Sequence, residues 1–305
     1  MVRIAAAAYP CEFLGSWAAY EDKLAAWVAE AAGQGAGLLV FPEWAGLELA
    51  TLEGRETAAD LVRCIDAQTA WLPRADALHA RLAAAHGVHI CAGSALVRRA
   101  DGRAVNRARL VTPSGAIGAQ DKLIMTRYER EVFHIHPGRE VRVFDTALGR
   151  IGIAICYDVE FPLIGRAMVE AGVEILLAPS CTEALSGASR VRIGARARAL
   201  EGQCISVQAP TVGAAEWNQA LDLTTGAAGI FCPPDRGFPM TGILAQGELD
   251  RPGWVLAEAD LSAVAAVRRD GGVLNMAHWP EQADGRLARL ATVDLTAAAA
   301  RSASG

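Results

Sequence analysis

Several features that mark whole classes of protein are missing from this sequence. No apolar run reaches the roughly 18 residues that a membrane-spanning helix needs, and the N-terminus lacks an apolar signal-peptide core of adequate length. A nucleic-acid surface needs clustered positive charge, whereas the net charge here is −5. We therefore expect a cytoplasmic protein that acts on neither membranes nor nucleic acids.

Metal-binding patterns are also missing. The seven cysteines include no C-x-x-C pair, so neither a zinc knuckle nor a dithiol redox motif is indicated. In a reducing cytosol most of these thiols are expected to be small buried hydrophobic groups. His134 and His136 flank a single residue, which is a weak metal signal. The sequence therefore predicts no metal site.

No linker rich in Pro or Ser divides the chain, and no internal repeat is present. Apolar residues make up 52% of the sequence, which is enough for a large core. The final stretch, "LTAAAARSASG", has little to bury. We expect one domain over 1–285 and a loosely ordered tail over 286–305.

Strand-like and helix-like segments alternate along the chain. Helices are expected from Ser16 to Gly33, over 75–87, from Pro162 to Ala171, and over 189–202. Continuously apolar strands are expected at 3–9, 37–44, 88–96, 173–180, 203–210, 226–234 and 253–261. Hairpin turns are expected at Asp101-Gly102, Ser114-Gly115 and Gly149. This mixture predicts an α/β protein whose helices cover the faces of its sheets.

One thiol stands at a strand end. The segment "IGIAICYDVEFP", 151–162, runs through branched apolar residues to Cys156 and then turns toward a helix that begins at Pro162. Loops at the ends of sheet strands are where α/β folds build their sites. A nearby helix N-terminus would lower the pKa of the thiol. The alternative is a plain buried cysteine, which is common.

Two charged residues also follow predicted strands. A nucleophilic thiol needs a base and a group that stabilises developing negative charge. Histidine is the usual base, and no single histidine is an obvious partner from its place in the sequence. Glu43 comes directly after "LLVFP", and Lys122 follows the strand-like segment before "KLIM". The alternatives are a surface glutamate and a solvated lysine.

Three segments together resemble motifs of the nitrilase, or carbon–nitrogen hydrolase, superfamily. They are "GAGLLVFPEWAG", "GAQDKLIMTRYERE" and "GRIGIAICYDVEFP", in the family's order of glutamate, lysine and cysteine. The likeness extends over about residues 2–262. It implies a four-layer αββα sandwich with two mixed β-sheets flanked by helices. It also implies a homodimer or a higher homo-oligomer.

The resemblance further implies roles for particular residues. Cys156 would attack the substrate carbon, Glu43 would take the thiol proton, and Lys122 would stabilise the oxyanion. A second family glutamate, which positions the lysine, is expected at Glu129, with Glu131 as the alternative. No metal or organic cofactor is implied. One departure is Ile124, which stands where many relatives have a histidine, and this weakens any transfer of substrate specificity.

The implied substrate is a small amide or N-carbamoyl compound. Candidates for contacts with it are Tyr157, Trp44, Arg127, Cys181, Arg190 and Trp217. The two arginines are proposed as a clamp for a substrate carboxylate, although most arginines are simply solvated or paired. The alternatives are a true nitrilase, an acyltransferase with the same three groups, and a binding protein with a relict site.

Overall fold

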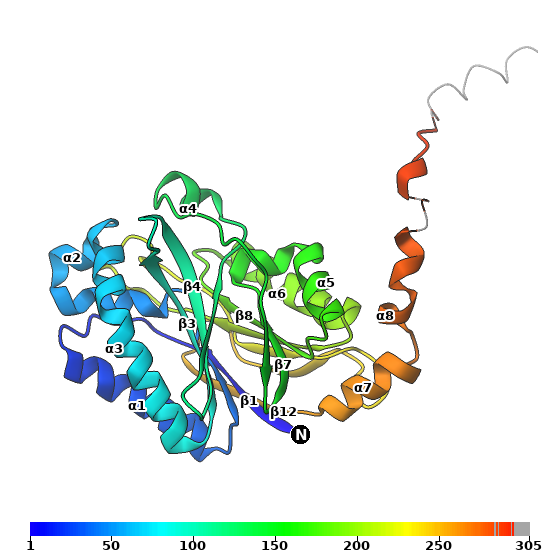
Figure 1. Ribbon diagram of the computed structural model, residues 1–305, viewed down its shortest axis with the longest axis horizontal. Helices are drawn as coiled ribbons and strands as arrows, with labels where there is room; N and C mark the ends of the chain where they lie inside the picture. The colour runs from blue at the N-terminus through cyan, green and yellow to red at the C-terminus, as the bar shows by residue number, and fades with distance from the viewer. Residues whose placement is uncertain (284, 286, 294, 296–305) are drawn as a thin grey trace, which may run out of the picture.

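Two six-stranded sheets form the centre of the molecule (Figure 1). The computed structural model describes residues 1–283, 285, 287–293 and 295. In spatial order, the first sheet contains β12 (Gly253–Ala259), β1 (Val2–Ala8), β2 (Leu38–Val40), β3 (His89–Arg98), β4 (Ala104–Val111) and β5 (Ile117–Asp121). The second contains β11 (Ile243–Gln246), β10 (Gly229–Phe231), β9 (Ile205–Pro210), β8 (Ile175–Ser180), β7 (Gly149–Ile153) and β6 (Val143–Thr146).

Both sheets have a parallel centre and antiparallel edges. In the first sheet β1, β2 and β3 are parallel, and β12, β4 and β5 complete it as antiparallel partners. In the second sheet β7, β8 and β9 are parallel, with antiparallel β6, β10 and β11 outside them. The predicted hairpin turns at Asp101-Gly102, Ser114-Gly115 and Gly149 are confirmed.

Helices cover the outer faces of both sheets, which gives the predicted αββα sandwich (Figure 1). α1 (Trp17–Gly33) and α3 (Arg63–His86) lie on the first sheet, and α5 (Pro162–Glu170) and α6 (Leu185–Glu201) lie on the second. The other helices are α2 (Arg55–Ala59), α4 (Arg127–Glu131), α7 (Leu261–Asp270) and α8 (Asn275–His278), with 3₁₀ helices η1 (Ala45–Glu53), η2 (Cys156–Glu160), η3 (Trp279–Ala283) and η4 (Leu287–Arg289).

The alternation of side chains along β1 explains why so much of the chain is apolar. Ile4, Ala6 and Ala8 face the core between the sheets, whereas Ala5 and Ala7 face the core beneath α1 and α3. A strand buried on both faces reads as a continuous apolar run. The small alanines also allow layers of side chains to pack closely on both sides.

The sequence predicted α1 correctly but placed the start of α3 too late. Ser16 caps α1 by accepting a hydrogen bond from Ala19 N at 3.2 Å. α3 begins at Arg63 and continues through Pro73, a residue that usually breaks helices. Side chains before the proline tie this part of α3 to β3: Gln68 Oε1 accepts from Leu96 N at 2.9 Å, and Thr69 Oγ1 accepts from Arg98 N at 2.9 Å.

After α7 the chain leads away from the sandwich through α8 (Figure 1). The predicted tail over 286–305 falls partly outside the described residues, which omit 286, 294 and 296–305. Across the part of the chain that the structure describes, every helix is too short or too polar to cross a membrane.

Candidate active site

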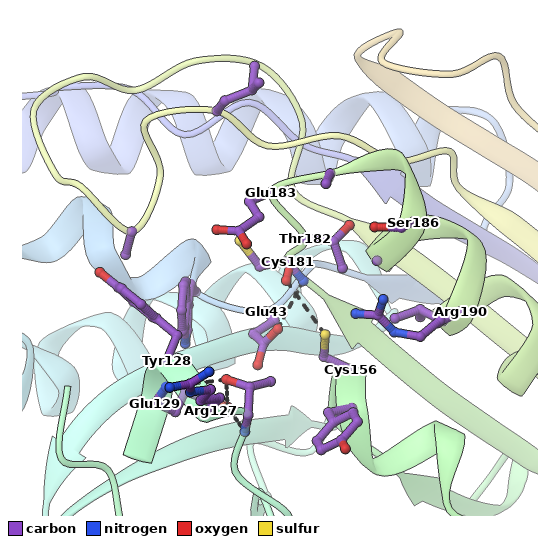
Figure 2. A pocket seen from close by; sticks show the side chains of 18 of the residues that line it. Glu43, Arg127, Tyr128, Glu129, Cys156, Cys181, Thr182, Glu183, Ser186 and Arg190 are labelled. Carbon is purple, nitrogen blue, oxygen red and sulfur yellow. Dashed lines mark hydrogen bonds between the residues drawn. The ribbon is translucent and has the colours of Figure 1, made fainter. Parts of the chain in front are cut away.

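A cavity of about 480 Å³ opens at one end of the sandwich, where strands of both sheets end (Figure 2). Glu43, Lys122, Glu129 and Cys156 are among the residues that line it. Glu43 follows β2 and Lys122 follows β5, both in the first sheet, while Cys156 follows β7 in the second. The fold thus brings the three strand-end residues singled out in the sequence into one cavity.

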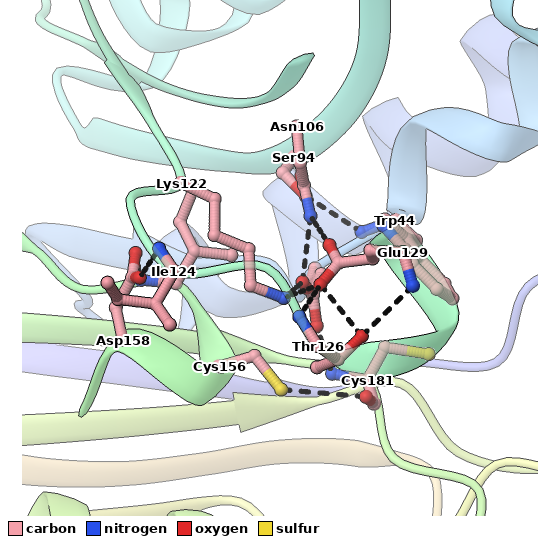
Figure 3. Close-up of polar contacts among 12 residues, drawn as sticks. Trp44, Ser94, Asn106, Lys122, Ile124, Thr126, Glu129, Cys156, Asp158 and Cys181 are labelled. Atoms are coloured by element: carbon pink, nitrogen blue, oxygen red, sulfur yellow. Dashed lines mark hydrogen bonds and ion pairs between the residues drawn. The ribbon is translucent and has the colours of Figure 1, made fainter. Parts of the chain in front are cut away.

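Lys122 lies between two carboxylates (Figure 3). Its Nζ donates to Glu43 Oε1 at 2.8 Å and to Glu129 Oε2 at 2.7 Å, and all three side chains are only 1% exposed. Asn106 Nδ2 also donates to both glutamates, to Glu43 Oε1 at 2.8 Å and to Glu129 Oε1 at 3.1 Å. The lysine and the asparagine together fix both carboxylates in place.

Local sequence directs Glu129 toward the lysine. Thr126 caps α4, and its Oγ1 accepts from Glu129 N at 3.2 Å, while Glu129 Oε2 accepts from Thr126 N at 2.9 Å and from Thr126 Oγ1 at 3.0 Å. This reciprocal pair is the capping box expected for a T-x-x-E sequence. The structure favours Glu129 over Glu131, which is exposed and pairs with Arg127 at 2.8 Å.

Glu43 and Cys156 meet at the backbone of Cys181. Cys181 N donates to Glu43 Oε2 at 2.9 Å, and the thiol of Cys156 donates to Cys181 O at 3.6 Å. The backbone is strained beside both groups, because Trp44 has φ 63° and Cys156 has φ 49°. Such conformations are unfavourable for residues with a β-carbon and persist where the surroundings hold them, often at functional sites.

Burial dominates the electrostatics of the site. Burial and the charge of Glu43 raise the pKa of the Cys156 thiol well above its usual range, so the expected lowering by a helix N-terminus is wrong. Burial also raises the pKa of Glu43, against the opposing charge of Lys122. Burial alone would lower the pKa of Lys122, but Glu129 and Glu43 raise it well above its ordinary value. Burial likewise opposes the charged form of Glu129, yet Lys122 keeps the pKa of Glu129 lowered.

These directions fix the resting protonation state near neutral pH. The thiol is neutral and the lysine is charged. A neutral thiol beside a carboxylate is a pair in which the proton can move to the oxygen when the sulfur attacks.

Most of the predicted substrate contacts border the cavity. Trp44, Tyr157, Cys181, Arg127 and Arg190 all line it. The two arginines already have acidic partners, however. Arg127 is highly exposed beside Glu131, and Arg190 Nε lies 3.4 Å from Glu160 Oε1.

Trp217 is the one predicted substrate contact that lies away from the cavity lining. Among the described residues that line the cavity it is absent. Its ring packs edge-on against Phe13, with centroids 6.4 Å apart. The side chain is half-buried and packs against the core beneath α1 and α3.

Asn106 and Asp158 also belong to the site, and neither was predicted from the sequence. Asn106 had a visible signal in the sequence, because it shares a face of β4 with Ala104, Ala108 and Leu110, and a polar residue on an apolar strand face needs a buried partner.

The signal for Asp158 was weaker, since it was only that of an acidic residue two positions after the thiol. Its buried carboxylate accepts the backbone N–H groups of Leu123, Ile124 and Ile155, and Figure 3 shows the contact with Ile124. Burial raises the pKa of Asp158 to about 7, although Lys122 and these N–H groups oppose that rise.

No group of three or more His, Cys, Asp or Glu side chains in the described ranges is arranged to hold a metal ion. Lys122 already occupies the space between Glu43 and Glu129, the two buried carboxylates among the described residues that line the cavity.

Comparison with known proteins identifies relatives along most of the chain. A probable hydrolase, YhcX, of Bacillus subtilis (strain 168) is 33% identical over 273 residues, covering 89% of this chain and 52% of that protein. A deaminated glutathione amidase of Yersinia enterocolitica is 39% identical over 30% of this chain and 32% of its own length. The chain therefore spans about half, or less, of the length of these curated relatives.

Solved structures show the same fold. A carbon–nitrogen hydrolase from Helicobacter pylori G27 superposes with a TM-score of 0.73 at 19% identity, covering 94% of this chain and 96% of that one. The NitN amidase from Nesterenkonia sp. AN1 gives a TM-score of 0.65 at 21% identity, with 88% and 97% covered. The family model for carbon–nitrogen hydrolases matches residues 3–269. This chain therefore belongs to the carbon–nitrogen hydrolase family.

Proposed function

We propose that the protein hydrolyses the C–N bond of a small amide or N-carbamoyl compound through a thioester on Cys156. The observation that carries this proposal is Lys122 held between Glu43 and Glu129 in the same buried cavity as the thiol. A nucleophile, a base and a fixed positive charge are the groups that acyl transfer requires.

In the first half-reaction Cys156 Sγ attacks the carbonyl carbon, and the thiol proton passes to Glu43. The Nζ of Lys122 and the backbone N–H after Cys156 stabilise the negative charge that develops on the carbonyl oxygen. The C–N bond then breaks, and the leaving nitrogen takes the proton from Glu43 and departs as ammonia or an amine. The acyl group stays on Cys156 as a thioester.

In the second half-reaction water attacks the thioester carbon and gives a proton to Glu43. The C–S bond breaks, the acid leaves, and the proton returns to the sulfur. Glu43 thus acts as base and acid in turn, a role that suits a carboxyl whose pKa burial has raised. Glu129 touches Lys122 and Asn106, so it orients the lysine and takes no proton.

Two observations support a small amide as the substrate. The cavity of about 480 Å³ has room for a small molecule. Several relatives are named deaminated glutathione amidases, and structural neighbours include amidases. A nitrile or an acyl-accepting amine would use the same three groups, so both belong in the test.

The test is a substrate panel with two readouts. The protein is incubated with small amides, N-carbamoyl amino acids and nitriles, with and without an added amine acceptor. Ammonia release and the intact mass of the protein are measured. We expect ammonia from the amides or carbamoyl compounds and a transient acyl adduct on Cys156. Faster turnover of nitriles, or acyl transfer that outpaces hydrolysis, would replace the amidase assignment.

Cys156→Ser supplies the decisive variant, since an alcohol is a far poorer nucleophile at neutral pH. We expect turnover to fall at least about a thousandfold. Cys64→Ser is the matched control, because Cys64 is also a buried thiol that donates to a backbone carbonyl, at Leu61, but lies outside the cavity. Equal activity in the two variants, or no turnover of any compound by the wild type, would reject the proposal.

A further inference from the structure

One buried carboxylate joins the lysine loop to the cysteine turn. Asp158 is 1% exposed. Its Oδ1 accepts from Ile124 N at 2.7 Å, both of its oxygens lie 3.1 Å from Leu123 N, and its Oδ2 accepts from Ile155 N at 3.3 Å. Figure 3 shows the carboxylate of Asp158 beside Ile124, on the opposite side of Lys122 from Glu129.

These donors belong to segments that come from different sheets. Leu123 and Ile124 directly follow Lys122 after β5, at the edge of the first sheet. Ile155 directly precedes Cys156, which β7 of the second sheet delivers to the cavity. A single side chain therefore fixes the backbone on the C-terminal side of the lysine to the backbone on the N-terminal side of the nucleophile.

The cysteine turn needs such a restraint. Cys156 has φ 49°, a conformation that the surroundings must hold in place. Asp158 lies in the same turn, where its own N–H donates to Ile155 O at 3.0 Å. Without its carboxylate, three buried N–H groups would lose their acceptor, and the turn could relax away from the lysine loop.

We propose that Asp158 is a positioning residue that sets the distance between the Lys122 ammonium and the Cys156 sulfur. The proposal rests on the function proposed above. Asp158 is absent from the described residues that line the cavity, so it acts through the two loops and not on the substrate. A misplacement of about 1 Å between reacting groups can cost about a hundredfold in rate.

Asp158→Asn tests this role because it keeps the size of the side chain but presents an NH₂ group to N–H donors. Asp235→Asn is the matched control. Asp235 is 8% exposed and also accepts three backbone N–H groups, from Arg236 at 2.6 Å, Gly272 at 2.7 Å and Val273 at 3.4 Å, but it lies away from the cavity. Any loss of stability or activity that comes only from removing a buried carboxylate should therefore appear in both variants.

We expect both variants to melt at lower temperature than the wild type. Only Asp158→Asn is expected to lower kcat, by about a hundredfold, with KM changed far less, because substrate contacts remain. Wild-type kcat in folded Asp158→Asn, or an equal fall in kcat in Asp235→Asn, would overturn the proposal. Should Asp158→Asn fail to fold, Asp158→Glu takes its place, and a wild-type kcat there contradicts the proposal equally.

A second readout does not depend on turnover. Acrylamide addition to Cys156 is followed by intact mass in the wild type and both variants. We expect addition about tenfold slower in Asp158→Asn than in Asp235→Asn, because the lysine no longer supports the developing charge. Equal rates would overturn the positioning role. A wild type that adds acrylamide at Cys156 but turns over no amide would instead count against the proposed function alone.

Discussion

At the scale of single residues, the site is defined by an imbalance of buried charge. Lys122 is one cation between two carboxylates, and all three side chains are almost inaccessible to water. Removing one partner from a buried ion pair typically costs about 3–5 kcal/mol, since it leaves a charge uncompensated. The neutral thiol does not add a further negative charge at rest. When the thiol proton moves to Glu43, the negative charge moves from the carboxylate to the sulfur. The net charge of the cavity is therefore unchanged.

The rate should depend on pH through the ionisation of Glu43. Glu43 must be ionised to accept the thiol proton, and burial raises its pKa above the ordinary 4.5. As pH falls through this raised pKa, Glu43 becomes protonated and kcat/KM should fall. We expect the acid limb of the profile of kcat/KM against pH to lie above pH 4.5. Lys122 should add no limb on the alkaline side near neutrality, because its pKa is raised.

Glu43→Gln and Glu48→Gln separate this base from other buried acids. Glu48 is also buried with a raised pKa, but its partners are Tyr9, Lys23 and the backbone of Glu12. We expect Glu43→Gln to abolish turnover and Glu48→Gln to keep the wild-type acid limb. An acid limb at or below the ordinary carboxyl value, or one that moves in Glu48→Gln, would mean that Glu43 is not the base.

Residues with chemistry at strand ends could be found from the sequence, whereas those that act through backbone contacts could not. Glu43, Lys122 and Cys156 each follow an apolar run, and the family motifs add Glu129. Asp158 bonds to residues more than thirty positions earlier in the chain, at 123 and 124. Nothing local in the sequence specifies that pairing.

At the scale of elements, short turns with demanding backbone conformations hold the site. The capping box of α4 has two tasks, because the carboxylate of Glu129 caps the helix and also binds Lys122. A change to the cap is therefore expected to affect both stability and rate.

Thr126→Ala tests this double role against Ser16→Ala. Both residues are N-caps that accept a backbone N–H at 3.2 Å, but Ser16 caps α1 on the outer face of the first sheet. We expect each change to destabilise the protein by about 1 kcal/mol in urea unfolding. Only Thr126→Ala should also lower kcat, by about tenfold, because Glu129 loses its contact with Oγ1. Unchanged kcat in Thr126→Ala would show that the cap does not position Glu129.

The bulge in β3 brings the backbone of Gly93 close to the backbone that carries Glu43. Gly93 has φ 67°, and a β-carbon there would lie 2.0 Å from Pro42 O, directly before Glu43. Gly102 has φ 79° in an open turn with nothing within 4 Å. Gly102→Ala should cost about 1–2 kcal/mol from backbone strain alone. We expect Gly93→Ala to cost about 3 kcal/mol more and to reduce kcat, because the Pro42–Glu43 backbone must move. Similar unfolding free energies for the two variants would contradict the clash.

Elements with strong periodicity were predictable, and those that depend on tertiary contacts were not. α1 has its cap, its apolar stripe and a glycine at its end, and all of these are local signals. The first half of α3 lacks them, and Pro73 predicts a break. The hydrogen bonds of Gln68 and Thr69 to β3 outweigh the tendency of Pro73 to break the helix. These bonds join α3 to a strand more than twenty residues later in the chain, so local sequence does not reveal them.

At the scale of the whole molecule, the two sheets matter because each supplies part of the site. The first delivers Glu43 and Lys122, and the second delivers Cys156. The core between the sheets therefore sets the geometry of the reaction as well as the stability of the fold. Periodicity predicted the strands and the helices that cover sheet faces, whereas the two-sheet, four-layer arrangement came only with the family resemblance. The strand order was not predicted, because non-local pairing has no local signature.

Three large apolar side chains are exposed on the outer face of α5 and α6. Leu163 on α5 is 77% exposed, and Ile193 and Leu200 on α6 are 68% and 45% exposed. Ile193 and Leu200 are seven residues apart and share a face of the helix. α5 and α6 lie against each other over the second sheet (Figure 1). Large apolar side chains left exposed on neighbouring helices mark a candidate association surface.

We propose that this face joins two copies of the chain, in keeping with the homo-oligomer that the family resemblance implies. Ile193→Glu would place a charge in an apolar interface and is expected to convert the dimer to a monomer in light scattering coupled to gel filtration. Val62→Glu is the control, since Val62 is 60% exposed but lies beside α3 on the first sheet. It should leave the mass unchanged. If both variants remained dimers, the interface would lie elsewhere on the molecule. A monomeric wild type would reject the proposed dimer. A monomeric Ile193→Glu that kept its kcat would also show that each subunit holds a complete site, as the cavity within one chain indicates.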